Sequence, residues 1–216
     1  MKKDRFYLYQ SKWSKTPVLH LLPHWNWEER LGQNVPVFCY TNYPKAELFI
    51  NGKSMGMKEK SKESKYNRYR MMWQDVTYQP GEIKVVAYNH EGLPVDTAAI
   101  KTAGETYRLR TTVDRREIKA DGQDLAFVTV EIVDKEGNLC PKADNLLFFE
   151  VEGNAHLKAA CNGDPTSQTS FASSYMRTFN GKLMLIVEAG DAVGSATLKV
   201  YGGHLLPAVE KILCID

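Results

Sequence analysis

The sequence has no pattern typical of a metal or redox site. Its four cysteines are Cys39, Cys140, Cys161 and Cys214, and none of them forms a CxxC pair or follows the spacing of a zinc site. Cys39 alternates with two valines in a strand-like pattern, where a free cysteine behaves as a small hydrophobic residue. We therefore expect buried free thiols, with one Cys140–Cys161 disulfide as the alternative.

Long hydrophobic runs and an excess of one charge are also missing. No stretch approaches the roughly 18 apolar residues of a membrane-spanning helix, and the first residues lack the apolar core and cleavage site of a signal peptide. The 28 basic and 26 acidic side chains nearly cancel. The one dense basic run, residues 58–70, contains two glutamates, so we expect a solvated loop or edge strand there. A polyanion contact is the alternative, but neither nucleic acid nor a membrane is an expected partner.

Motifs of catalysis are equally absent. The sequence has no nucleophile elbow and no glycine-rich phosphate loop. Glu28 and Glu29 are adjacent, and neighbours on an extended chain point apart. Ser167, Ser170, His156 and Asp164 show no sequence pattern of a catalytic set, so we predict no catalytic residue and no cofactor.

Two segments contain oxygen or nitrogen ligands at suggestive spacing. His20 and His24 are four residues apart, but Pro23 argues against the helix that would bring them together on one face. Residues 162–166 (NGDPT) offer carboxylate and amide oxygens, yet calcium requires six to eight oxygens and these residues are ordinary turn formers. We predict a turn and no metal site.

The first 27 residues predict one helix and a connection. Phe6, Tyr9 or Gln10, and Trp13 recur at helical spacing, and Asp4 is placed to cap a helix over residues 4–13. About three turns are too short to be stable alone, so we expect this aromatic face to pack on the first sandwich or to fray. Residues 20–27 are predicted to be extended.

From residue 35 onward the pattern is that of β-strands, without helices between them. Asn51-Gly52 is a strong hairpin signal. The first set of predicted strands covers residues 35–41, 47–50, 53–58, 69–73, 82–88 and 93–101, which is typical of an antiparallel sandwich.

A second set of strands follows a short polar break at residues 102–105. Residues 125–133 show the clearest alternation, and residues 161–175 form a long polar loop. Residues 205–216 fit either a helix or a final strand. The other predicted strands are residues 107–113, 146–152, 183–188 and 196–201.

Several segments resemble a known family in the same order along nearly the whole chain. FYLYQSKW and LHLLPHWNW resemble the junction at which the catalytic (β/α)8 barrel ends in bacterial family 2 glycoside hydrolases of the β-galactosidase type. VPVFCYTNYPKAELFINGKSMG and PGEIKVVAY resemble the accessory β-sandwich that follows the barrel. IKADGQDLAFVTVEIVDKEGNLCPKADNLLFFEVEG and CNGDPTSQTSF are similar to the next domain, which is bacterial immunoglobulin-like and related to invasin repeats.

This resemblance implies an all-β fold of two consecutive immunoglobulin-like antiparallel β-sandwiches with a short N-terminal helical remnant. Residues 1–22 would end the barrel and connect it, residues 23–103 would form the first sandwich and residues 104–216 the second. The parent would be a bacterial retaining β-glycosidase, commonly oligomeric and periplasmic or extracellular. Its two catalytic glutamates would lie in the barrel, outside this sequence.

The resemblance therefore predicts a non-catalytic region whose partner is the catalytic barrel, with a glycan or further copies as other partners. Trp25, Trp27 and Trp73 are the candidates for sugar or interdomain contacts, because aromatic rings offer flat apolar faces. Core packing is the simpler interpretation of all three. A carbohydrate-binding module and a generic immunoglobulin-like adhesion module are the alternatives. An exposed row of aromatic residues on one sandwich face would favour the carbohydrate-binding module.

Overall fold

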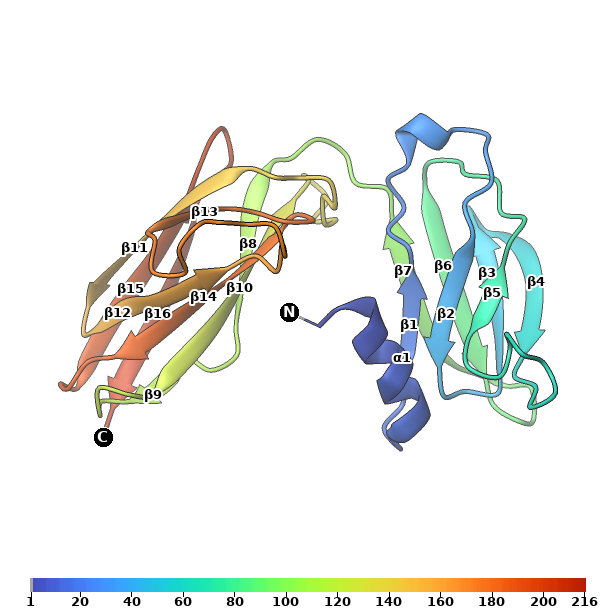
Figure 1. The fold of residues 1–216 in the computed structure, drawn as a ribbon, viewed down its shortest axis with the longest axis horizontal. Coiled ribbons are helices and arrows are strands. Elements are labelled where there is room, and N and C mark those ends of the chain that lie inside the picture. Colours follow the sequence, from blue (N-terminus) through green and yellow to red (C-terminus); the bar gives the residue numbers. More distant parts are fainter. Residues whose placement is uncertain (1) are drawn as a thin grey trace. The chain divides into compact units, whose positions relative to one another are not determined.

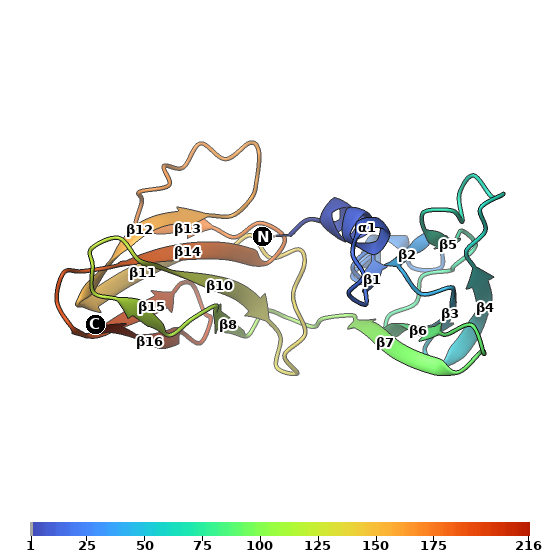
Figure 2. The same cartoon turned by 90° about the horizontal axis from the view of Figure 1, so that it is seen from below.

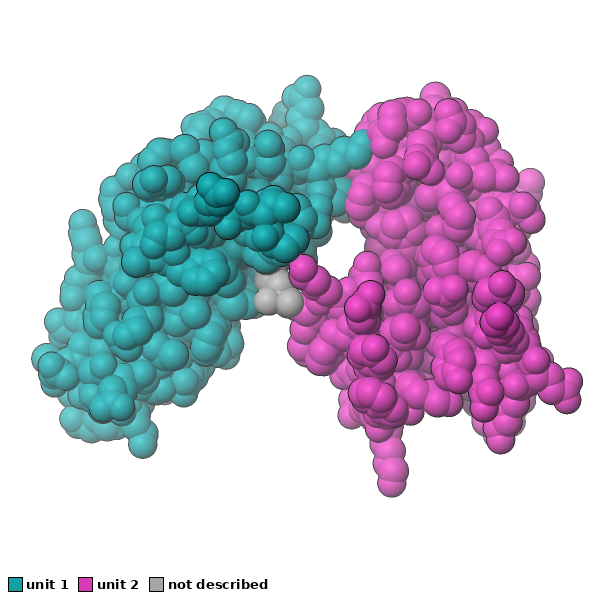
Figure 3. Space-filling view, in the orientation of Figure 1, with its two compact units in different colours: residues 1, 103–216 teal, residues 2–102 magenta. Residues whose placement is uncertain are grey.

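The computed structural model describes residues 2–216, which divide into two compact units (Figure 3). The first unit comprises residues 2–102 and the second residues 103–216. One short helix opens the first unit, and mainly antiparallel sheets make up most of the rest of both units (Figure 1). The predicted all-β class with two sandwiches and a short N-terminal helix is confirmed.

The first unit stacks two small sheets. One has the strand order β1-β2-β5, and the other has the order β4-β3-β6-β7. Every pairing in both sheets is antiparallel. The elements are α1 (Asp4–Trp13), β1 (Leu19–Leu22), a 3-10 turn (Glu28–Arg30), β2 (Val37–Thr41), β3 (Lys45–Ile50), β4 (Lys53–Glu59), β5 (Met71–Trp73), β6 (Glu82–Tyr88) and β7 (Pro94–Lys101).

The predicted hairpin at Asn51-Gly52 joins β3 to β4. Both residues have positive φ, 48° at Asn51 and 82° at Gly52. That backbone twist matches the right-handed twist of paired strands, and glycine and asparagine adopt it at the lowest cost. The turn therefore sets the register of the β3–β4 pair.

Three large aromatic side chains lie among the aliphatic residues in the core of the first unit. Trp25 and Tyr78 are fully buried and meet edge to face, with ring centroids 5.0 Å apart. The indole N–H of Trp25 donates to the Gln79 carbonyl at 2.9 Å. The indole N–H of Trp73, on β5, donates to the carbonyl of Gly56 on β4 at 2.9 Å. This second bond ties one sheet to the other.

The second unit has longer strands in two larger sheets. Their orders are β12-β14-β10-β8 and β13-β11-β15-β16-β9, and β16 with β9 is the parallel pair. The elements are β8 (Arg108–Val113), β9 (Glu117–Lys119), β10 (Leu125–Val133), β11 (Leu146–Gly153), β12 (Ala155–Cys161), β13 (Tyr175–Arg177), β14 (Lys182–Ala189), β15 (Gly194–Tyr201) and β16 (Ala208–Ile215).

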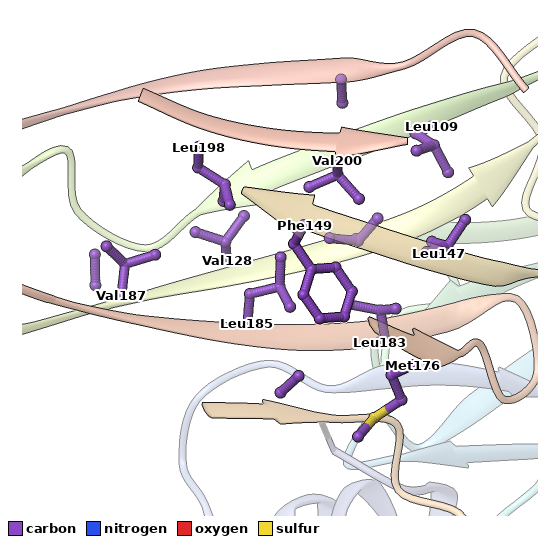
Figure 4. Packing of buried hydrophobic residues seen from close by; sticks show 14 of the residues in the cluster. Leu109, Val128, Leu147, Phe149, Met176, Leu183, Leu185, Val187, Leu198 and Val200 are labelled. Atoms are coloured by element: carbon purple, nitrogen blue, oxygen red, sulfur yellow. The ribbon is translucent and has the colours of Figure 1, made fainter. Parts of the chain in front are cut away.

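Aliphatic side chains dominate the core of the second unit (Figure 4). Alternate residues of each strand point inward, as at Val128 on β10, Leu185 on β14 and Leu198 on β15. Phe149 from β11 is the large ring among them. The core is thus built by regular alternation of the strands.

Several local predictions are corrected by the structure. Lys3 occupies the N-cap position of α1 and no side chain caps the helix, so Asp4 lies in the first turn instead. Residues 20–22 of the segment predicted to be extended belong to β1, a strand that the prediction did not identify and that pairs with β2. Tyr69 precedes β5 in a turn. The C-terminal segment is a strand, β16, and the prediction omitted β9, β12 and β13.

Candidate functional site

The three tryptophans singled out by the sequence all join the core of the first unit. Trp25 and Trp73 lie inside it, and Trp27 packs against it half-buried. Trp25 and Trp73 therefore present no ring face on which a sugar could stack. Trp27 is covered on one side by His24, with ring centroids 4.5 Å apart, and its N–H donates to the His24 carbonyl.

The histidines and acidic residues considered for chemistry are held in structural contacts. His20 lies 2.8 Å from the Asp4 carboxylate, and His156 lies 2.7 Å from the Glu188 carboxylate. Within residues 2–216, no three histidine, cysteine or acidic side chains gather in a way that could hold a metal ion. Over the same residues, no helix is long and apolar enough to cross a membrane.

The segment at residues 162–166 is a turn, as predicted. The Asn162 side-chain oxygen accepts the backbone N–H of Asp164 at 2.9 Å, and Asp164 in turn accepts the N–H and hydroxyl of Thr166. The oxygens considered for calcium therefore organise the backbone. The turn opens the long loop between β12 and β13, which arches away from the sandwich (Figure 2). Near its end, the Phe171 carbonyl accepts the backbone N–H of Ala160 on β12.

All four cysteines are free thiols. Cys39, Cys140 and Cys214 are buried, and Cys161 is half-buried. Burial raises the pKa of the Cys39 thiol to about 12. Burial, together with the nearby Asp134 carboxylate, raises the pKa of Cys140 to about 11. Because the thiolate is the nucleophile, these two cysteines are chemically inert in the folded chain.

Helix α1 packs on the first sandwich through a different face from the one predicted. Tyr7 stacks on His20 of β1, with ring centroids 3.9 Å apart and planes at 12°, and Ser11 is buried. The hydrogen bond from His20 holds the pKa of Asp4 below its ordinary value, against the opposing effect of partial burial. Tyr7, Ser11 and the His20–Asp4 pair therefore fix the helix to the sheet.

The predicted aromatic face of α1 points to solvent. Phe6 is 41% exposed, Tyr9 48% and Trp13 77%. Tyr9 and Trp13 stack on each other, with centroids 4.9 Å apart and planes at 8°. With Gln10 and Ser14 these rings line an open groove of about 460 Å³. Three adjacent exposed rings on one short helix are typical of a surface that another part of a protein covers.

Two family models divide the chain as its two sandwiches do. Residues 109–209 match the glycoside hydrolase family 2 C-terminal domain 5, and residues 32–96 match DUF4982, a domain of unknown function. The chain carries C-terminal domains of bacterial family 2 glycoside hydrolases. The predicted family resemblance is thereby confirmed.

Relatives with curated names or solved structures match nearly the whole of this chain, but only part of their own length. The β-galactosidase BoGH2A of Bacteroides ovatus is 42% identical over 97% of this chain and 24% of its own length. A putative β-glucuronidase of Formosa agariphila is 33% identical over 87% of this chain and 18% of its own. The crystal structure of a β-glycosidase from Bacteroides vulgatus superposes with a TM-score of 0.91 at 32% identity, over 99% of this chain and 27% of that one.

This chain thus spans about a quarter or less of the length of the curated relatives that it matches.

A row of exposed aromatic rings on the second sandwich was not predicted from the sequence. Phe148 on β11, Tyr175 on β13 and Tyr201 on β15 lie side by side on the outer face of the five-stranded sheet. The signal was the pair Phe148-Phe149, because two consecutive rings in a strand must face opposite sides of the sheet.

Proposed function

We propose that this chain is a non-catalytic scaffold of a family 2 glycoside hydrolase and that α1 docks it onto the catalytic barrel. Residues 23–103 and 104–216 would serve as consecutive accessory domains behind that barrel. They would brace the barrel, shape the entrance to its substrate cleft or build the oligomer.

The exposed ring face of α1 carries this proposal. Phe6, Tyr9 and Trp13 lie on the side of the helix opposite to Tyr7 and Ser11, which hold it to the first sandwich. Rings of this size contribute most to association when they are buried at the centre of an interface. The relatives are about four to five times as long as this chain, so ample polypeptide is available to cover the face.

The names of the relatives support a proposal for the chemistry of the whole enzyme. Those relatives are described as β-galactosidases and β-glucuronidases. We propose that the parent hydrolyses β-glycosides with retention of configuration. This mechanism requires a nucleophilic carboxylate and an acid/base carboxylate about 5 Å apart, and both would be supplied by the barrel.

The decisive experiment compares Trp13→Ala in two contexts. In the isolated chain, the variant should change the free energy of unfolding by less than about 0.5 kcal/mol, because the ring is exposed. In the full-length enzyme it should lower the midpoint of thermal inactivation, measured with 4-nitrophenyl β-galactoside and β-glucuronide, by several degrees. An interface anchor of this kind contributes about 2 kcal/mol or more.

Phe171→Ala is the matched control. Phe171 is 66% exposed and lies in the loop between β12 and β13 of the second sandwich, outside the helix that carries Trp13. It should leave thermal inactivation unchanged. Equal effects of the two variants, or no effect of Trp13→Ala in the full-length enzyme, would refute docking through this helix.

A further inference from the structure

The outer face of the second sandwich presents three aromatic rings in a row. Alternation along β11 places Phe149 in the core, 3% exposed, and Phe148 on the outside, 39% exposed. Phe148 pairs in register with Tyr175 on β13 and with Tyr201 on β15. The ring centroids are 6.3 Å and 5.8 Å from that of Phe148, so the row crosses three adjacent strands.

This row lies outside the core of its own unit. The inward residues of the same strands, such as Leu147, Phe149 and Val200, already fill the core. Phe148 and Tyr175, which is 47% exposed, keep much of their ring surface in water. Exposed aromatic clusters of this kind mark binding surfaces.

Polar groups border the rings on one side. The next cross-strand pair is Glu150 with Lys199. The Tyr201 hydroxyl donates to the Glu150 carboxylate at 2.6 Å, and the Lys199 ammonium group lies 5.1 Å from the centroid of the Tyr201 ring. A carboxylate and an ammonium group therefore lie beside the exposed rings, with the ammonium group over the Tyr201 ring.

We propose that Tyr175, Phe148 and Tyr201 form a binding site for an oligosaccharide or polysaccharide, whose β-linkage rests on the proposed function of the parent enzyme. A pyranose ring has an apolar face of C–H groups and a rim of hydroxyls, so it matches an aromatic surface edged by donors and acceptors. The centre of a stable protein interface is instead depleted of lysine and glutamate. Here Glu150 and Lys199 lie directly beside the rings, which favours a glycan over a protein partner.

This proposal does not depend on the docking of α1. It goes beyond a scaffold role, because the chain would itself hold a glycan. The sugar surface is also distinct from the predicted one: it lies in the second sandwich and contains none of Trp25, Trp27 and Trp73.

The test is affinity electrophoresis of the 216-residue chain in gels that contain β-1,4-galactan or mixed-linkage β-glucan, with dextran as the α-linked reference. The unmodified chain should be retarded by at least one β-glycan and not by dextran. Phe148→Ala and Tyr201→Ala should each weaken that binding at least about tenfold, since each removes one stacking ring. Phe171→Ala, an exposed ring outside the row, should bind like the unmodified chain.

Two further measurements separate binding from folding and from self-association. Tyr201→Phe removes the hydroxyl that contacts Glu150 but keeps the ring, and it should bind within about threefold of the unmodified chain. The melting temperatures of all variants should match, because the row lies outside the core. No retardation by either β-glycan, or equal weakening by Phe171→Ala, would overturn the proposal. So would a dimer in solution that Phe148→Ala dissociates, because the occupant would then be a second copy.

Discussion

The two sandwiches fill their cores by different means. The first places three large rings among its aliphatic residues, with Trp25 and Tyr78 fully buried and Trp73 nearly so. The second contains many Val, Leu and Ile side chains that alternate along strands of up to nine residues. In the first unit the strands of the smaller sheet are only three to five residues long.

The difference shows what short strands require. A three-residue strand contributes at most two inward side chains, so the volume must come from larger residues and from the loops that carry them. Each buried indole then needs an acceptor for its N–H, and here the acceptors are the carbonyls of Gln79 and Gly56. The first core therefore adds three large aromatic side chains to its aliphatic residues, whereas the second consists mainly of aliphatic ones.

The largest effect is expected from Trp73→Ala. The variant should cost about 3–5 kcal/mol and remove the bond that joins β5 to β4, so that the first unit unfolds at a lower temperature. Its counterpart, Leu185→Ala, should cost about 2–5 kcal/mol in the second unit. Differential scanning calorimetry of the chain should show that each variant shifts one transition only.

Val209→Ala, on the exposed face of β16, is the surface control and should change stability by less than about 0.5 kcal/mol. A common shift of both transitions in either core variant would show that the two units unfold together. The two cores would then differ in composition, but the two units would not unfold independently.

A smaller effect is expected at Asp134, which pins the start of the second unit. Its carboxylate accepts the backbone N–H of Gly104 at 2.9 Å, and the backbone N–H and side-chain amide of Asn138 at 2.7 and 3.0 Å. Burial opposes ionisation, but these hydrogen bonds outweigh it and hold the pKa of Asp134 below its ordinary value. Asp134→Ala should therefore cost about 1–3 kcal/mol.

The lowered pKa also gives this contribution a pH dependence. Asp134 stabilises the second unit fully above the unfolded-state pKa of about 4, and the stabilisation is lost as the pH falls through the lower folded-state value. Thermal melts from pH 6 to pH 2 should show a weaker acid dependence of the second transition in Asp134→Ala than in the unmodified chain. The exposed Asp144→Ala should not alter that dependence.

The smallest expected effect is a difference in the labelling rates of two cysteine thiols. Cys161 is half-buried in the second unit, whereas Cys39 is buried in the first, with a pKa raised to about 12. With a disulfide reagent at pH 8, Cys161 should react in the folded chain and Cys39 only after unfolding of the first unit. Mass spectrometry of the labelled peptides distinguishes them. Early labelling of Cys39 would show that the core of the first unit opens locally.

Strands with a regular alternation of apolar and polar residues were predicted from the sequence, and strands without it were not. Residues 125–133 alternate strictly, and β10 occupies those same residues. β12 was missed because its sequence, AHLKAAC, is weak in β-branched residues and its pairing contains a bulge after Leu157. The tail was ambiguous because Glu210 occupies an inward position of β16. Its charge is accommodated there by the Thr111 hydroxyl and by an ion pair with Arg116.

The sequence pattern also did not show which aromatic rings would be exposed on the surface. Helical spacing identified Phe6, Tyr9 and Trp13 as one face of α1, but it could not show that Tyr7 and Ser11 would contact the sheet instead. Composition suggested tryptophan as a sugar platform, although the structure buries Trp25 and Trp73. The exposed row of Phe148, Tyr175 and Tyr201 comes from three strands that are distant in sequence.

The sequence by itself determined the class of fold, most strands, the Asn51-Gly52 hairpin and the family resemblance, since each is encoded by neighbouring residues with period two or by a local turn. Only the tertiary structure decided which rings are core and which are surface. A strand pattern gives each residue one of two faces, but the pairing of distant strands and the packing of one sheet on the other determine which face meets water.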